Sequence, residues 1–148
     1  MTFDADKYVN RFPAQKHDQF LIPAGTIHCS GSGCMVLEIS ATPYIFTMKL
    51  WDWGRLEFDG RPRPLHIDHG EKVIQWDRRT EWVKENLVDQ ARMLEENADY
   101  TVERTGLHAL EFIETRRYTV RTECLLSTDN NLNVLNLVEG DEAVVESL

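Results

Sequence analysis

The sequence lacks the features that mark several classes of protein. Lys and Arg number 16 against 25 Asp and Glu, so the formal net charge is −9 and the isoelectric point lies near 5.0. Because phosphate backbones attract clustered positive charge, this balance argues against nucleic acid as a partner. No apolar run is long enough to span a membrane, and the N-terminus lacks the basic-then-apolar pattern of a signal peptide. We therefore expect a cytoplasmic protein without membrane contact.

Cysteine is also scarce. Cys29, Cys34 and Cys124 form an odd set with no Cys-x-x-Cys spacing. Free thiols are therefore expected, in place of a disulfide framework or a structural zinc site. The 148 residues, of which 42% are hydrophobic, suffice for one globular domain with a core.

Residues 20–53 are the stretch around which the chain is organised. We expect residues 20–22 to end a strand, because Pro23 fixes φ and cannot donate to a ladder while Gly25 permits a tight bend. His28 follows this bend directly. A barrel strand that leaves such a corner is expected to point the imidazole inward.

Two further strands are expected after this corner. Residues 34–40 alternate, and one face carries Glu38 beside apolar side chains. After a turn at residues 41–45, a strand at residues 47–53 places Lys49 on one face. If both faces point inward, Glu38, Lys49 and the imidazole of the corner meet in one cavity.

The motifs PAGTIH, VLEIS and DWGR occur in this order, and the run continues to RPRPLHI. This ordered set resembles the second cupin motif and the later part of class I mannose-6-phosphate isomerases, more closely in the first half of the chain than in the second. The resemblance implies a mainly β fold, a cupin-type antiparallel jelly-roll barrel with short helices. A jelly roll needs about eight strands. Fewer are expected here, so the barrel is either composite or incomplete.

Three segments are expected along the chain. Residues 1–76 form a cupin barrel segment with the PAGTIH corner, residues 77–104 a connecting segment, and residues 105–148 a second strand-rich, cupin-like segment. Between residues 81 and 100 the apolar spacing favours a helix, whereas the resemblance implies an extended connection. The other expected elements are a short helix at residues 5–9 capped by Asp4, a helix at residues 69–76 capped by Asp68, strands at residues 105–114 and 118–126, and a hairpin of residues 134–138 and 143–145.

The resemblance implies that His28 is a metal ligand, with zinc or another divalent metal as the cofactor. Zinc with an open coordination position polarises a sugar carbonyl while protein ligands fill the other positions. The family's first cupin motif, with its paired histidines and a glutamate, does not occur in this sequence. One ligand alone cannot hold a catalytic zinc, so we expect this chain alone to bind the cofactor weakly or to lack it. The alternative for His28 is a corner histidine bonded to backbone or to Glu38.

Three further residues are assigned roles by the resemblance. Isomerisation between an aldose and a ketose needs a base near the sugar and positive charge for the developing oxyanion. Glu38 and Lys49 are the candidate catalytic residues, although the family pattern has an arginine where Lys49 stands; their alternative is a salt bridge between strands. Arg55 is the candidate substrate or phosphate contact, and its alternative is stacking on Trp51 or Trp53.

The resemblance therefore implies a metal-dependent isomerase that acts on a phosphorylated hexose through an enediol, as part of a longer protein. Two alternatives stay open. The first is a non-catalytic sugar-binding or regulatory cupin, which the lysine at position 49 and the single metal ligand favour. The second is a structural domain that mediates assembly, for example of a homo-oligomer, which unpaired strand edges favour.

Overall fold

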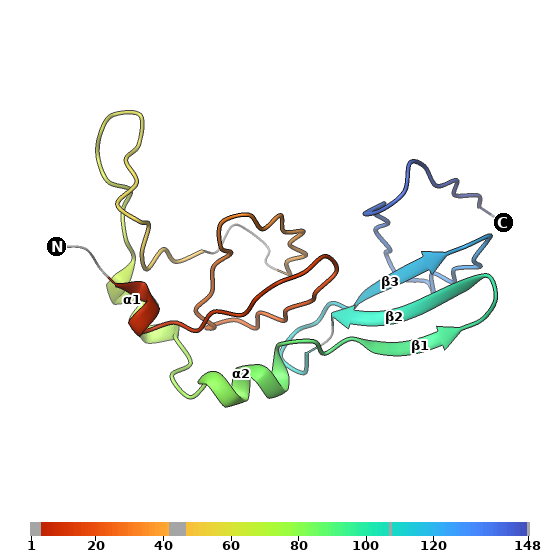
Figure 1. The fold of residues 1–148 in the computed structure, drawn as a ribbon, viewed down its shortest axis with the longest axis horizontal. Coiled ribbons are helices and arrows are strands. Elements are labelled where there is room, and N and C mark those ends of the chain that lie inside the picture. Colours follow the sequence, from red (N-terminus) through yellow and green to blue (C-terminus); the bar gives the residue numbers. More distant parts are fainter. Residues whose placement is uncertain (1–3, 42–46, 107, 148) are drawn as a thin grey trace.

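A computed structural model describes residues 4–41, 47–106 and 108–147. Figure 1 shows the sheet at one end of the molecule and long loops of the first half at the other. The elements are the 3-10 helix η1 (Ala5–Lys7), the helices α1 (Ile67–Val73) and α2 (Thr80–Asn86), and the strands β1 (Arg92–Glu96), β2 (Tyr100–Gly106) and β3 (Thr115–Val120).

The three strands form one antiparallel sheet in the order β1-β2-β3. The turn between β1 and β2 is closed by Asn97, whose side-chain oxygen accepts hydrogen bonds from the backbone N–H groups of Asp99 and Tyr100, both at 2.9 Å. In the central strand, the side chain of Val102 is buried. The regular part of the fold is thus β-rich and antiparallel, as the sequence predicts.

A small apolar core joins the N-terminal segment to the chain that leads into the sheet. The backbone N–H of Leu21 donates to the carbonyl of Leu87 at 2.9 Å, and Phe20 forms an isolated bridge with Val88. Leu21, Leu87 and Pro23 are all buried. Through this contact the region before the PAGTIH corner lies against the end of α2.

The strands expected at residues 34–40 and 47–53 do not form in the described residues. Residues 34–40 are exposed on both alternating faces, because no strand edge within the described part of the chain lies beside them. The expected turn at residues 41–45 lies, apart from Ala41, outside the described residues. Of residues 20–22, only Phe20 is in a bridge. Alternation alone therefore did not predict pairing.

The helices are close to the expected positions but have different ends. α1 begins two residues before the expected residue 69 and ends at Val73; Asp68 lies in its first turn, and no side chain caps it. α2 follows the helical spacing up to Asn86, but the helix prediction is wrong beyond that point, where β1 and the start of β2 form an extended connection. η1 lies within the expected helix at residues 5–9, but Asp4 makes no capping bond.

The strand predictions for the second half are partly wrong. The chain turns at residues 108–112, in the middle of the strand expected at residues 105–114, and β3 begins three residues before the expected residue 118. No strand forms in the described residues from 121 to 147, where the hairpin was expected. The carboxylate of Glu139 holds this segment to the N-terminal region through Lys16 at 2.5 Å and His17 at 2.7 Å.

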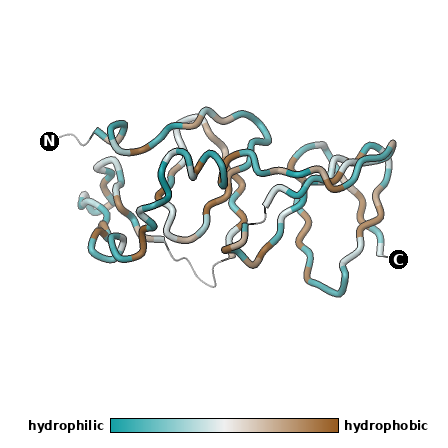
Figure 2. Tube along the Cα trace, turned by 90° about the horizontal axis from the view of Figure 1, so that it is seen from below, coloured by the Kyte–Doolittle hydropathy of each residue, from teal (hydrophilic) through white to brown (hydrophobic). Residues whose placement is uncertain are grey.

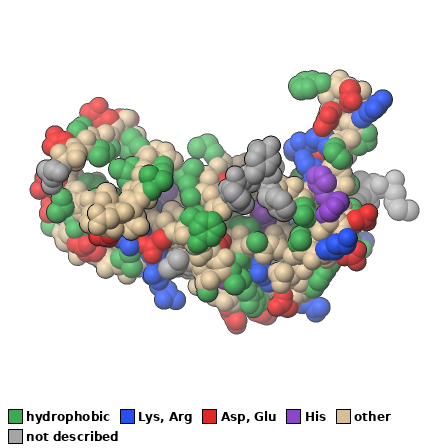
Figure 3. All heavy atoms as spheres, turned by 180° about the vertical axis from the view of Figure 1, so that it is seen from behind, with side chains coloured by type: hydrophobic (Ala, Val, Ile, Leu, Met, Phe, Trp, Pro, Cys, Tyr) green, Lys and Arg blue, Asp and Glu red, His purple; other side chains and the backbone are tan. Residues whose placement is uncertain are grey.

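Hydrophobic residues are spread along the chain in this structure. Figure 2 shows hydrophobic segments in both halves, and Figure 3 shows hydrophobic side chains at many points of one face among charged ones. The three cysteines are free, as predicted. Within the described residues, no helix is both long and apolar enough to cross a bilayer.

Candidate functional site

The PAGTIH corner is a tight turn that only glycine fits at its centre. The backbone N–H of Thr26 donates to the carbonyl of Pro23 at 3.2 Å, and Gly25 has a φ of +81°. A Cβ at Gly25 would lie 2.5 Å from the carbonyl oxygen of Val73. The carbonyl of Gly25 accepts a hydrogen bond from the backbone N–H of Gln75 at 3.0 Å. The corner is thereby packed against the end of α1.

One arginine holds the outer side of this corner. Arg78 donates from Nη1 to the carbonyls of Pro23 and Ala24, at 3.0 and 2.6 Å, and to the hydroxyl of Thr26 at 2.6 Å. Its guanidinium also lies 5.3 Å from the ring centroid of Trp82 on α2. The corner is therefore fixed to both ends of the segment that connects α1 to α2.

His28 is exposed, and its ring contacts the backbone. Nδ1 lies 2.9 Å from the carbonyl oxygen of Thr26. Because a carbonyl only accepts hydrogen bonds, Nδ1 carries the proton in this contact and Nε2 keeps its lone pair. This contact matches the alternative in which the histidine bonds to backbone. It also orients the ring so that Nε2 is the nitrogen available to a ligand.

Asp52, in the DWGR motif, is the buried charge of the region. It is 7% exposed, and its two carboxylate oxygens accept hydrogen bonds from Nε and Nη2 of Arg63 at 2.5 and 2.6 Å. The hydrogen bonds from Arg63 lower the pKa of Asp52, with further contributions from the charges of Arg63, Lys49 and Arg55. The carboxylate therefore stays ionised at neutral pH.

Lys49 is half-buried beside this ion pair. Its Nζ lies 4.0 Å from Oδ1 of Asp52. Two hydrogen bonds with His66 fix its backbone. The ring Nδ1 of His66 accepts from the backbone N–H of Lys49 at 3.0 Å, and the backbone N–H of His66 donates to the carbonyl of Lys49 at 2.7 Å. The next residue, Leu50, packs against Gly70 of α1. The backbone at Lys49 is thus held in place by His66 and by the packing of Leu50 on α1.

Arg55 adopts the stacked arrangement that was its alternative. Its guanidinium lies 5.4 Å from the ring centroid of Trp53, and the rings of Trp51 and Trp53 are 4.7 Å apart. The backbone N–H of Arg55 donates to the carbonyl of Asp52 at 2.9 Å. The DWGR turn therefore places an exposed cation next to the Asp52 ion pair.

The structure brings only part of the expected constellation together. Lys49 and Arg55 lie around Asp52, but no hydrogen bond or ion pair joins Glu38 to Lys49 or to His28 in the described residues. Glu38 is exposed. The roles of Glu38, Lys49, Arg55 and His28 stay predictions.

The described residues do not fit a complete metal site. In residues 4–41, 47–106 and 108–147, no group of three His, Cys, Asp or Glu side chains is placed to hold a metal ion. His66 uses Nδ1 to bind the backbone of Lys49. His28 can therefore supply one ligand, through Nε2, but not a zinc site by itself.

Sequence reasoning missed the residues that hold this region together. Asp52 enters the sequence analysis only within the DWGR motif, and Arg63, His66 and Arg78 are assigned no role there. The partners of Asp52 and Arg78 lie 11 and 52 to 55 residues away. The charged residue within an apolar run, Asp52 in LWDWG, was a usable signal, since a buried charge needs a partner.

Comparison with known proteins identifies relatives for about half of the chain. It is 34% identical over 71 residues to the mannose-6-phosphate isomerase of Streptococcus mutans. It is also 31% identical over 70 residues to the mannose-6-phosphate isomerase ManA of Bacillus subtilis, and 32% identical over 71 residues to the probable mannose-6-phosphate isomerase GmuF of the same species. The resemblance seen in the motifs is thus confirmed.

These matches cover 47 to 48% of the chain and 22% of the length of each relative. No family model matches the chain, and no solved structure does. The similarity therefore applies to a segment of the relatives.

Proposed function

We propose that the chain is a portion of a mannose-6-phosphate isomerase-like enzyme. Its reaction would be the metal-dependent interconversion of an aldose and a ketose, on a phosphorylated hexose, through an enediol. The observation that carries this proposal is the similarity of about half the chain to three mannose-6-phosphate isomerases. We further propose a cytoplasmic location and a cupin-type jelly-roll barrel completed by other parts of a longer protein or by a second subunit. Residues 1–76 would carry the site, residues 77–104 connect, and residues 105–148 form a second cupin-like segment.

Lys49 is the proposed cation for the oxyanion. Enediol formation develops negative charge on the sugar oxygens, so a cation aimed there stabilises the transition state more than the bound substrate. Arg63 already satisfies both oxygens of Asp52 at 2.5 and 2.6 Å, whereas Lys49 is 4.0 Å away. The ammonium of Lys49 is therefore held near the site by charge without being committed to Asp52.

Glu38 and Arg55 complete the proposed set. Glu38 is the base that moves the proton between adjacent carbons, and its exposure leaves its carboxylate accessible to a substrate. Arg55 is the phosphate contact, because its guanidinium is exposed and planar and can bind a phosphate through two nitrogens. Bringing Glu38 to Lys49 requires the segment at residues 34–40 to pair in the complete barrel.

The metal, zinc or another divalent cation, would polarise the sugar carbonyl when bound. His28 is its proposed ligand in this chain, through Nε2, and the other ligands would come from outside the described residues. The 148-residue chain is therefore expected to bind zinc weakly. Stoichiometric zinc that survives dialysis against a mild chelator, and is lost in His28→Ala, would show that the chain has a complete site after all.

The kinetic test of the proposal uses Lys49 in the full protein, with mannose 6-phosphate as the first substrate. Lys49→Ala should lower kcat roughly a hundredfold or more, the usual effect of losing one oxyanion donor, and should change KM less. Lys49→Arg should retain activity, because it keeps the charge. An unchanged kcat with a raised KM would make Lys49 a binding residue. Absence of isomerase activity in the metal-loaded full protein would overturn the proposal.

A second candidate is a non-catalytic sugar-binding or structural cupin domain. It is favoured by the lysine at position 49, where the family pattern has an arginine, and by the single metal ligand. Saturable binding of a phosphorylated hexose without turnover would support the sugar-binding version. Absence of binding, together with a concentration-dependent oligomer, would support the structural one.

A further inference from the structure

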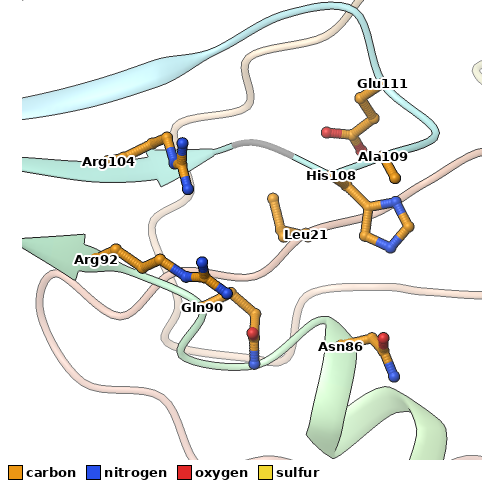
Figure 4. A pocket seen from close by; sticks show the side chains of 8 residues that line it. All are labelled: Leu21, Asn86, Gln90, Arg92, Arg104, His108, Ala109 and Glu111. Carbon is orange, nitrogen blue, oxygen red and sulfur yellow. The ribbon is translucent and has the colours of Figure 1, made fainter.

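A pocket of about 480 Å³ lies where the sheet meets α2 and the N-terminal segment. Figure 4 shows its walls: Leu21 lies at its centre, Arg92 and Arg104 come from neighbouring strands, and His108 and Glu111 come from the loop after β2. It shares no lining residue with the Lys49 and Asp52 region. The pocket belongs to the second half of the chain and to the contact between the two halves.

The two arginines of this pocket lie opposite each other on neighbouring strands, on the same face of the sheet. Arg92 on β1 and Arg104 on β2 are register partners, so their side chains leave the same face of the sheet. Within the described residues neither guanidinium has an ion pair or a hydrogen bond. Like charges directly opposite each other on neighbouring strands destabilise a sheet. In a chain with a net charge of −9, two adjacent unpaired arginines form an unusual local excess of positive charge.

The opposite wall carries side chains that can form hydrogen bonds with hydroxyl groups. Nδ1 of His108 accepts the backbone N–H of Leu110 at 3.1 Å, so the neutral ring carries its proton on Nε2, which can donate. The carboxylate of Glu111 is without an ion pair in the described residues and can accept. Asn86 uses its NH₂ group to bind the carbonyl of Trp82 at 2.8 Å, which leaves its side-chain oxygen as a further acceptor.

We propose that this pocket binds a small phosphorylated molecule that carries hydroxyl groups. The phosphoryl group lies between Arg92 and Arg104, whose planar forks match its oxygens, and it removes the repulsion between them. The hydroxyl-bearing part lies toward His108 and Glu111, over the apolar floor of Leu21. The carboxylate of Glu111 selects against a ligand that is anionic at both ends. This site is separate from the proposed isomerase site and does not depend on it.

The test is a calorimetric titration of the full protein with sorbitol 6-phosphate, sorbitol and inorganic phosphate. Sorbitol 6-phosphate should bind saturably at a site that depends on Arg92 and Arg104, apart from any binding at the proposed isomerase site and more tightly than inorganic phosphate, and sorbitol should not bind. Arg92→Gln or Arg104→Gln should weaken binding about ten- to hundredfold, since each removes a charge-assisted contact. Arg61→Gln, which changes an exposed arginine outside the pocket, should leave the affinity unchanged. Added NaCl should weaken the binding.

Thermal unfolding separates a binding role of the arginines from a structural one. Without ligand, Arg92→Gln should unfold at the same temperature as the wild type or higher, because it relieves the repulsion across the strands. With sorbitol 6-phosphate, the rise in Tm seen for the wild type should be smaller in the variant.

With the wild type and the arginine variants, three results would overturn the proposal: equal binding of sorbitol, unchanged affinity in both arginine variants, or inorganic phosphate binding as tightly as sorbitol 6-phosphate. Titration of the Lys49→Ala protein keeps the two proposals apart. Binding should persist there, so a failed isomerase assay with intact arginine-dependent binding rejects only the isomerase. Loss of binding in Lys49→Ala would assign the ligand to the other site and reject this one.

Discussion

Residues 34–40 and strand β2 are both seven residues long, but only β2 lies in a sheet. Within the described residues β2 has a neighbouring strand on each side, whereas residues 34–40 have none. Leu37 in the first stretch is 57% exposed, whereas Val102 in β2 is 5% exposed. The period of a sequence selects which side chains share a face, but the partner edges decide whether a strand forms.

Each half of the molecule is accordingly stabilised by a different kind of interaction. The sheet depends on backbone ladders and on the burial of Val102. The region around the PAGTIH corner depends on polar contacts: Arg78 on the corner, and Arg63 on Asp52. Substitutions in each region therefore test this difference.

The largest expected effect is that of Gly25→Ala. The variant needs a φ of +81°, which an L-residue adopts at a cost of about 1–2 kcal/mol. Its Cβ would also lie 2.5 Å from the carbonyl oxygen of Val73, so the backbone must move. We expect a total loss of about 3 kcal/mol or more in the free energy of unfolding, measured by urea titration.

Gly33→Ala is the matched control, since its φ is +82° and nothing lies within 4 Å of the added Cβ. Gly33→Ala should lower the free energy of unfolding only by the cost of the positive φ, about 1–2 kcal/mol. Equal losses in the two variants would mean that the corner is not packed against α1.

A smaller effect is expected from Val102→Ala. It removes two methyl groups from the buried face of β2 and should lower the free energy of unfolding by about 2 kcal/mol. Leu37→Ala, by contrast, should change it by less than about 0.5 kcal/mol, because Leu37 already faces solvent. A large loss in Leu37→Ala would show that residues 34–40 are buried in solution, by a second copy or by a longer chain.

Arg63→Gln removes both hydrogen bonds from the buried carboxylate of Asp52, and Lys49 at 4.0 Å offsets only part of that loss, so we expect a lower free energy of unfolding at neutral pH. The pH dependence is more informative. The folded-state pKa of Asp52 is lowered below its ordinary value of 3.8, so its contribution to stability is present above that value and is lost as the pH falls through the folded-state pKa. Arg63→Gln should flatten the loss of stability below about pH 4. An unchanged acid limb in equilibrium unfolding would mean that this ion pair does not stabilise the fold.

Local signals in the sequence predicted local features well. The spacing of Val83 and Leu87 predicts a helix, and α2 forms there. The bend at Pro23 and Gly25 is present, and Arg55 and His28 make contacts named in advance as alternatives. Features that depend on a distant partner were not predicted. The end of α2 at Asn86 and the role of Arg78 depend on contacts across many residues.

The same difference between local features and features that need a distant partner applies to the candidate site. The motifs pointed to the correct relatives because a short ordered set of residues is visible in one sequence. Whether Glu38 reaches Lys49 depends on pairing of residues 34–40, which no local pattern specifies. The same holds for Arg92 and Arg104, whose meeting depends on the register of β1 and β2.

The hold of Arg78 on the corner also bears on how the chain folds during its synthesis. The groups it binds on Pro23, Ala24 and Thr26 precede it by 55, 54 and 52 residues. At translation rates of about 5–20 residues per second, the corner leaves the ribosome roughly 3–10 seconds before its anchor. The meander of β1, β2 and β3 has only neighbouring pairings and can close as soon as it emerges. The corner is thus made several seconds before the residue that fixes it, and both are made before the sheet.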